Sequence, residues 1–132
     1  MKSVMLSIKP KWCELIASGK KTVEVRKTRP KIETPFKCYI YCTKQCDVFN
    51  RDAKLFIKNK ECNGKVIGEF VCDEISRIEP PYINAHFSLR VGCCLRYDEL
   101  CGYLGGKGGY GWHISDLVIY DEPKDISEFK KY

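Results

Sequence analysis

The sequence lacks any long hydrophobic run, and this absence excludes helical membrane-spanning proteins. No window of its 132 residues approaches the roughly 18 continuous apolar residues of a membrane helix. The apolar stretch from Val4 to Ile8 is about five residues long, which is shorter than the apolar core of a secretory signal peptide. We therefore expect a protein with no membrane partner and a cytoplasmic location.

The sequence also lacks internal repeats, low-complexity linkers and a phosphate-binding P-loop. The stretch GYLGGKGGYG holds six of the ten glycines, but no strand leads into it, and Lys107 is followed by Gly108. A P-loop needs a preceding strand and a Ser or Thr directly after its lysine. We expect a single domain over residues 1–132, in which this stretch forms a flexible flap with Lys107 at its tip.

Cysteine, in contrast, is abundant, with nine residues. An odd count without an export signal indicates reduced thiols and not a disulfide framework. The spacing of Cys38, Cys42 and Cys46 is compatible with a zinc site, which stays open as an alternative. In the run FKCYIYC, however, alternation places the first two of these cysteines on one face with apolar neighbours. We therefore favour small buried hydrophobic residues and predict no metal and no cofactor.

Positive charge is concentrated in the first half of the chain. The net charge is +6, yet residues 1–60 carry 15 Lys and Arg against 5 Asp and Glu, whereas residues 61–132 carry 8 against 12. A basic half within one domain often forms a basic face that suits polyanions such as RNA. A solvated lysine-rich surface is the alternative that charge alone leaves open.

Local patterns predict two short helices. Pro10 suits the first position of a helix, apolar residues follow it at helical spacing, and Gly19 is placed to end it. We therefore predict a helix at about 10–18. A second helix is predicted at about 97–104, where it would be closed by Gly105.

Between these helices the pattern changes to strands. The strand at 22–26 would turn Val23 and Val25 inward and Glu24 to the opposite face. A long strand at 65–78 is expected to bend near Gly68 or Cys72. Further strands are predicted at 4–8, 36–44 and 110–123, the last of them possibly two strands that meet at Ser115-Asp116. Together these elements indicate an α+β fold, a small mixed β-barrel.

The stretch GKKTVEVRK carries the most specific pattern, with five charges in nine positions around two valines. Within it, Gly19, Lys21, Glu24 and Arg26 fit the pattern G-x-K-x-x-E-x-R directly after the first strand and helix. This arrangement resembles the ASCH domain family of the PUA-like superfamily. The segments KVIGEF and YGWHISDL are similar to a middle strand and the closing strand of its barrel. The resemblance implies a PUA-like mixed β-barrel of about five to seven strands.

The resemblance also implies a cleft, lined by the motif, the first strand and the closing strand, that binds RNA or a nucleotide-like molecule. We therefore predict an RNA- or nucleotide-binding protein. The alternative is an enzyme that acts on modified nucleosides or RNA, because a few family members are ribonucleases and a small subgroup hydrolyses N4-acetylcytidine. The catalytic lysine of that subgroup matches Lys21, its threonine falls at Glu24, and its glutamate has no placed match here. In this alternative, Lys21 and Glu24 would be the catalytic residues, in acid–base roles.

The motif residues define the predicted cleft. Glu24 and Arg26 lie two apart on a strand, so they share a face roughly 6.5 Å apart, where they can hold a fixed geometry. Strand alternation places Lys20 with them, whereas the family motif selects Lys21, and both are candidates. Because sealing charges inside a protein is costly, we expect Glu24 and Arg26 to face a solvent-reachable cleft with Lys21 at its rim. A structural ion pair is the alternative.

Further candidates come from the neighbouring strands. Tyr39 and Tyr41 share one face of the strand and lie near Thr43 and Lys44. Aromatic and basic groups placed in this way suit base stacking with phosphate contact, although tyrosines on a half-exposed strand need no ligand. Ser7 and Lys9 end the first strand and could reach the same cleft.

The closing strand supplies the last candidates. Trp112 and His113 would lie across the cleft from the motif, and Lys107 would reach it from the flap. A histidine in an alternating strand is more often structural, and its spacing from Ser115 does not by itself build a catalytic triad.

Overall fold

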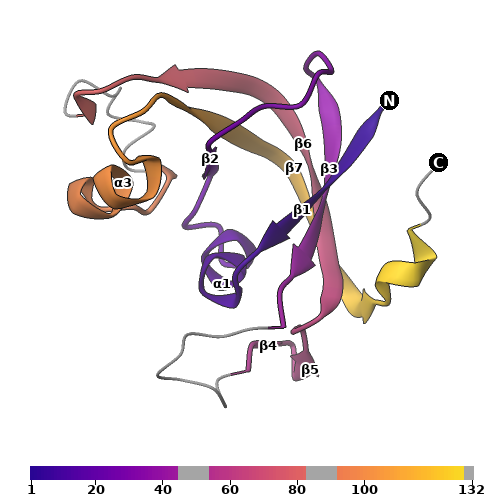
Figure 1. The fold of residues 1–132 in the computed structure, drawn as a ribbon. Helices are drawn as coiled ribbons and strands as arrows, with labels where there is room; N and C mark the ends of the chain where they lie inside the picture. Colours follow the sequence, from indigo (N-terminus) through magenta and orange to yellow (C-terminus); the bar gives the residue numbers. More distant parts are fainter. Residues whose placement is uncertain (45–53, 83–91, 130–132) are drawn as a thin grey trace.

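The computed structural model describes residues 1–44, 54–82 and 92–129. Its centre is a curved sheet of five strands in the order β1-β3-β6-β7-β2, with a separate two-stranded hairpin beyond the end of β3 (Figure 1). Each strand predicted from the sequence is confirmed to within two residues at either end. The five are β1 (Ser3–Ile8), β2 (Val23–Arg26), β3 (Phe36–Cys42), β6 (Lys65–Ile78) and β7 (Gly109–Lys124).

The sheet is mixed and barrel-like, but strand pairing does not close it. Strand β1 pairs with β3 in parallel, and the other three pairings are antiparallel. In the described part of the chain, no strand pairing joins the two edge strands, β1 and β2. We call the line between these two edges the seam. The predicted α+β, barrel-like architecture is confirmed, with five strands in the main sheet.

The two longest strands, β6 and β7, bend through irregular pairing. Their register shifts beside Gly68 and just after Cys72, where the sequence predicted a bend. At Gly68 the strands approach so closely that a Cβ atom would lie 2.4 Å from the carbonyl oxygen of Val118. Strand β7 continues through Ser115-Asp116 as one strand, because Asp116 takes a left-handed conformation (φ 48°) at a bulge. These bends help to curl the sheet around the core.

Both predicted helices are confirmed. Helix α1 spans Pro10–Ala17, and α3 spans Tyr97–Leu104. Gly19 (φ 82°) and Gly105 (φ 62°) take the left-handed conformation where each helix ends. Among the residues that the structure describes, no helix has the length and apolar character needed to cross a membrane. The remaining elements are β4 (Phe56–Ile57), β5 (Lys60–Glu61) and the 3-10 turn η2 (Ile126–Glu128).

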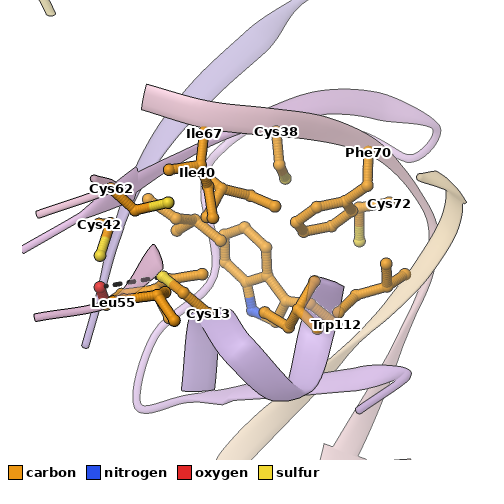
Figure 2. Close-up of a cluster of buried hydrophobic side chains, with 14 of the residues drawn as sticks. Cys13, Cys38, Ile40, Cys42, Leu55, Cys62, Ile67, Phe70, Cys72 and Trp112 are labelled. Carbon is orange, nitrogen blue, oxygen red and sulfur yellow. Dashed lines mark hydrogen bonds between the residues drawn. The ribbon is translucent and has the colours of Figure 1, made fainter. Parts of the chain in front are cut away.

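The main hydrophobic core lies inside the curve of the sheet and is rich in cysteine. Figure 2 shows Cys13 of α1, Cys42 of β3 and Cys62 gathered on one side of the core, with Trp112 at its centre. The predicted alternation of Cys38 and Cys42 toward the core is confirmed. In the described ranges, the buried cysteines are Cys13, Cys38, Cys42, Cys62, Cys72 and Cys93.

Except at Cys42, whose pKa is lowered by a side-chain hydrogen bond with Cys13, burial makes these thiols poor nucleophiles and poor metal ligands. It raises the pKa of Cys72 to about 11 and also raises the pKa of Cys38. Cys46, the third residue of the zinc spacing, lies outside the described residues. Within the described ranges, no group of three or more His, Cys, Asp or Glu side chains is placed to hold a metal ion.

A second, smaller core lies on the other side of β2. Val23 and Val25 pack there against the leucines of α3. Glu24 pairs directly with Trp112 across the β2–β7 ladder, and Trp112 belongs to the main core, so Glu24 points to the inside of the barrel. The valines are buried as predicted, but they occupy the second core. Both faces of β2 are therefore covered, and the charged face is the one turned inward.

Candidate functional site

A cleft of about 400 Å³ lies along the seam, where β1, α1, β2 and α3 meet. Five predicted site residues come together in it, namely Ser7, Lys9, Lys21, Glu24 and Arg26. The volume falls within the range of roughly 300–1,000 Å³ typical of small-molecule sites. Among the described residues, the lining consists of Ser7, Ile8, Lys9, Trp12, Lys21, Glu24, Val25, Arg26, Leu95, Glu99, Gly102 and Tyr103.

Lys21 lies at the floor of this cleft and not at its rim, which corrects the expectation from the sequence. After the left-handed turn at Gly19, the Lys21 N–H donates to the carbonyl of Leu15, so the chain doubles back toward α1. The Nζ atom donates to the carbonyl oxygen of Cys93 at 2.5 Å and lies 4.9 Å from the centre of the Trp12 ring. Only 2% of the side chain is exposed, and these contacts replace the water that the ammonium has lost.

Glu24 is the centre of a chain of charged groups. Its Oε1 atom lies 3.6 Å from Lys21 Nζ, and its Oε2 atom accepts a hydrogen bond from Arg26 Nη1 at 3.2 Å. The Glu24 side chain is 8% exposed and that of Arg26 is 30% exposed. A carboxylate buried to this extent needs such partners, because removing an ion from water costs several kcal/mol. The two cations also hold the carboxylate in one orientation.

Arg26 also ties the two edges of the seam together. Its Nη1 atom donates to the backbone carbonyl of Ser7 on β1 at 3.3 Å, so one side chain spans edges that no strand pairing joins. Within the described residues, both hydrogen bonds of Arg26 come from Nη1. A guanidinium has further N–H donors on Nε and Nη2, for which the described residues provide no hydrogen-bond acceptor.

Two aromatic rings stand on the walls of the cleft. Trp12 comes from α1 and Tyr103 from α3. A further lysine lies over each ring. Lys11 Nζ is 4.6 Å from the centre of the Trp12 ring, and Lys27 Nζ is 5.1 Å from the centre of the Tyr103 ring. The walls therefore interleave aromatic faces with positive charge.

Glu99 contributes a second carboxylate to the cleft. It is the third residue of α3, where its Oε1 atom accepts from the backbone N–H of Arg96, the residue before the helix, at 3.1 Å. Its Oε2 atom lies 3.7 Å from Lys11 Nζ. With Glu99 included, the described lining carries three basic and two acidic side chains.

Trp112 and His113 lie outside the described lining, although both pair directly with β2. Trp112 is in the main core, edge-to-face with Phe36 at a centroid distance of 5.5 Å, and its indole N–H has no hydrogen-bond partner among the described residues. His113 is on the opposite face of β7, exposed, with Nδ1 2.7 Å from Asp73 Oδ1. Strand alternation separates these two neighbours.

Tyr41 and Thr43 are also absent from the described lining. Tyr41 faces outward from the sheet, because its neighbours on β3, Ile40 and Cys42, point into the core. Thr43 follows the strand, and its hydroxyl is buried without a hydrogen-bond partner among the described residues.

Lys20 and Lys107 are exposed and do not belong to the described lining. Lys107 lies in the turn between α3 and β7. Its N–H donates to the Leu104 carbonyl, and its own carbonyl accepts from the Tyr82 hydroxyl at 2.5 Å. The backbone of Lys107 is therefore anchored beside the second core.

Sequence reasoning missed three wall residues, Trp12, Glu99 and Tyr103. The patterns around these three residues predict only the two helices and assign no role to these side chains. One signal was present, because Glu99 and Tyr103 are four residues apart and so lie on one side of a helix. Which side of α3 faces the motif depends on how the helix docks, and no local pattern encodes that docking.

Comparison with known families agrees with this geometry. The family model of the ASCH domain matches residues 6–88, a range that contains the second half of β1, all of α1 and β2, and the pattern G-x-K-x-x-E-x-R. The chain belongs to the ASCH domain family. The resemblance predicted from the motif is therefore confirmed. A search of curated proteins found no match.

Solved ASCH structures share the fold of this ASCH domain. The crystal structure of ASCH from Zymomonas mobilis is similar with a TM-score of 0.70 and 22% identity, covering 98% of this chain and 77% of that one. A tyrosine-to-phenylalanine mutant of that protein gives a TM-score of 0.70 at 21% identity, covering 98% and 80%. A serine-to-alanine mutant gives 0.67 at 23%, covering 98% and 78%. The TM-scores show that the PUA-like fold is shared, and sequence identities this low support no conclusion about function.

Proposed function

We propose that the cleft of this ASCH domain binds RNA or a nucleotide-like ligand. The observation that carries the proposal is the charged chain Lys21–Glu24–Arg26 at the floor of a cleft of about 400 Å³. A carboxylate held between two cations can accept from an amino or imino group of a base. The neighbouring guanidinium can donate to a base carbonyl, a ring nitrogen or a phosphate. Adjacent donors and acceptors of this kind suit the hydrogen-bonding edge of an unpaired base.

The walls of the cleft support the same proposal. Unpaired bases stack on aromatic side chains, while nearby lysines and arginines bind the phosphates. Trp12 and Tyr103 offer the rings, and Lys9, Lys11 and Lys27 offer the charges. All three lysines belong to the basic first half of the chain, so the charge asymmetry of the sequence is consistent with a local role here.

Fluorescence anisotropy of labelled single-stranded RNA, titrated with the protein at several salt concentrations, tests the proposal. We expect binding that weakens steadily as salt rises, because phosphate contacts release counterions. We also expect a blunt duplex of the same sequence to bind more weakly, because its paired bases cannot enter the cleft. An absence of binding at low salt, or binding indifferent to salt, would contradict the proposal.

A pair of matched variants locates the binding to the cleft. Arg26→Gln should lower RNA affinity by roughly ten- to a hundredfold, since a hydrogen bond to a charged group contributes about 1.5–3 kcal/mol. Arg77→Gln removes the same charge from an exposed position on β6, outside the described lining, and should change affinity little. Equal losses in the two variants would indicate non-specific charge attraction. Circular dichroism of both variants controls for folding.

Hydrolysis of modified nucleosides or RNA is a second candidate function, because Lys21 Nζ and Glu24 Oε1 lie 3.6 Å apart in the cleft. They would then act as an acid–base pair. However, Lys21 donates to the Cys93 carbonyl and faces both Glu24 and the Trp12 ring, which are the contacts of a cation, so we place binding first. Chromatographic screening of N4-acetylcytidine and RNA tests this candidate. Turnover that is lost in Lys21→Met would favour it, and no turnover would exclude these two substrates.

A further inference from the structure

The cleft contains a second carboxylate, which is not part of the charged chain Lys21–Glu24–Arg26. Glu99 lies on the wall contributed by α3, with 28% of its side chain exposed. It is held in place by the backbone N–H of Arg96 at 3.1 Å, by Arg96 Nε at 3.6 Å and by Lys11 Nζ at 3.7 Å. The position of this negative charge is therefore set by the start of α3 and by α1, independently of the motif on β2.

A phosphate inside the cleft would meet two carboxylates. Glu24 lies at the floor, and the two cations beside it, Lys21 and Arg26, are already paired with it. Glu99 adds negative charge to the wall, so the lining carries three basic against two acidic side chains, and a phosphate beside α3 would face the Glu99 carboxylate directly. Repulsion between like charges is strong where water is scarce. An uncharged base meets no such repulsion, and its N–H groups can donate to either carboxylate.

Positive charge that is available to a phosphate lies at the mouth of the cleft. Lys11 approaches Glu99 from outside, with 68% of its side chain exposed. Lys9 is exposed at the end of β1, and Lys27 lies over the outer aromatic ring, that of Tyr103. Exposed lysines of this kind bind phosphates with little desolvation cost.

We propose that Glu99 is a specificity-determining residue, which admits the neutral base of a nucleotide to the cleft and keeps its phosphate outside on the lysines at the mouth. This inference rests on the proposed function, since it assigns an orientation to a nucleotide-like ligand, with its base inside the cleft and its phosphate outside. It also requires that the base enters unpaired, as bases do when they are extruded into protein pockets.

The test compares nucleosides with their 5′-monophosphates. Cytidine, adenosine, guanosine and uridine, each with its 5′-monophosphate, are titrated by ligand-observed NMR or calorimetry into the wild type and into Glu99→Gln. For the nucleosides that bind, wild type gives the reference ratio of monophosphate to nucleoside affinity, which includes the contribution of the lysines at the mouth. Glu99→Gln should tighten monophosphate binding about tenfold while leaving nucleoside binding nearly unchanged.

Asp98→Asn is the matched control. It removes the same charge from the adjacent position of α3, but Asp98 is exposed and does not belong to the described lining. The side-chain carbonyl of glutamine at position 99 can still accept from the Arg96 N–H, so the start of the helix should be kept. An equal gain in Asp98→Asn, or no gain in Glu99→Gln while ligands bind, would overturn this inference and leave the proposed function standing. No binding of RNA, nucleoside or monophosphate by wild type would overturn both.

Discussion

Strand β2 has two buried faces of opposite chemistry. Val23 and Val25 are 6% and 5% exposed against α3, and Glu24 between them is 6% exposed toward the cleft. Burial of the valines is favourable in itself, because it removes apolar surface from water. Burial of Glu24 is unfavourable unless Lys21 and Arg26 offset the lost hydration. One face of the strand therefore stabilises the fold, whereas the other is retained at a cost, which the proposed binding role would explain.

The largest expected effect falls on the charged face. Glu24→Gln would leave Lys21 and Arg26 beside each other without the carboxylate they share. We expect the free energy of unfolding, measured with urea, to fall by roughly 3–5 kcal/mol, together with the loss of RNA binding. Unchanged stability in this variant would show that the charged floor is not buried in solution.

A triple variant separates the expected loss of stability from the expected loss of RNA binding. Replacing the whole chain by apolar residues, as Lys21→Met, Glu24→Leu and Arg26→Met, removes every ion at once. Apolar replacement of a complete buried ion network is often neutral or stabilising. We expect unfolding close to that of wild type and no RNA binding. If RNA affinity survived in this variant, the cleft would not be the binding site.

The next effect concerns the apolar face. Leu100→Ala on α3 removes buried volume from the second core, so the free energy of unfolding should fall by about 2–5 kcal/mol. Leu100 is not part of the described cleft lining, so RNA affinity measured well below the unfolding midpoint should stay within a fewfold of wild type. A large loss of affinity in Leu100→Ala would show that the two faces of β2 are energetically coupled through α3.

The smallest effect comes from an ion pair on the outer face of the sheet, which contrasts with the buried network. Lys37 Nζ at 2.8 Å and, secondarily, the Tyr120 hydroxyl at 2.7 Å hold the pKa of Glu69 below its usual range. A lowered folded-state pKa stabilises the protein above the ordinary pKa of a glutamate. That stabilisation is lost as pH falls through the lowered value.

Wild type should therefore lose slightly more stability than Glu69→Gln between about pH 6 and pH 3, as measured by thermal unfolding across that range. The difference should be small, because an exposed pair contributes little. Lys37→Met should reduce the acid sensitivity in the same direction. If Glu69→Gln and wild type lost stability equally, the pair would have no measurable role.

Several features of this ASCH domain were determined by the sequence itself, because the forces that set them act locally. Pro10 and Gly19 bound the first helix through their own backbone preferences, and Gly105 ends the second. Alternation along β3 buries Cys38 and Cys42 whatever strand pairs beside them. The spacing of the motif on a turn and a short strand was enough to identify the family and to select Lys21, Glu24 and Arg26.

Only the tertiary structure decided how these parts form a cleft. Strand alternation turns Trp112 and His113 to opposite faces of β7, and the long-range packing of β7 in the sheet decides that Trp112 is the one that enters the core. Lys21 reaches the floor because α1 folds over it, and Glu99 joins the wall because α3 docks on the valines of β2. The unpaired seam depends on how five strands curl around one core, which is a property of the whole chain. Contacts between residues distant in sequence follow from docking and register, and no local pattern specifies these.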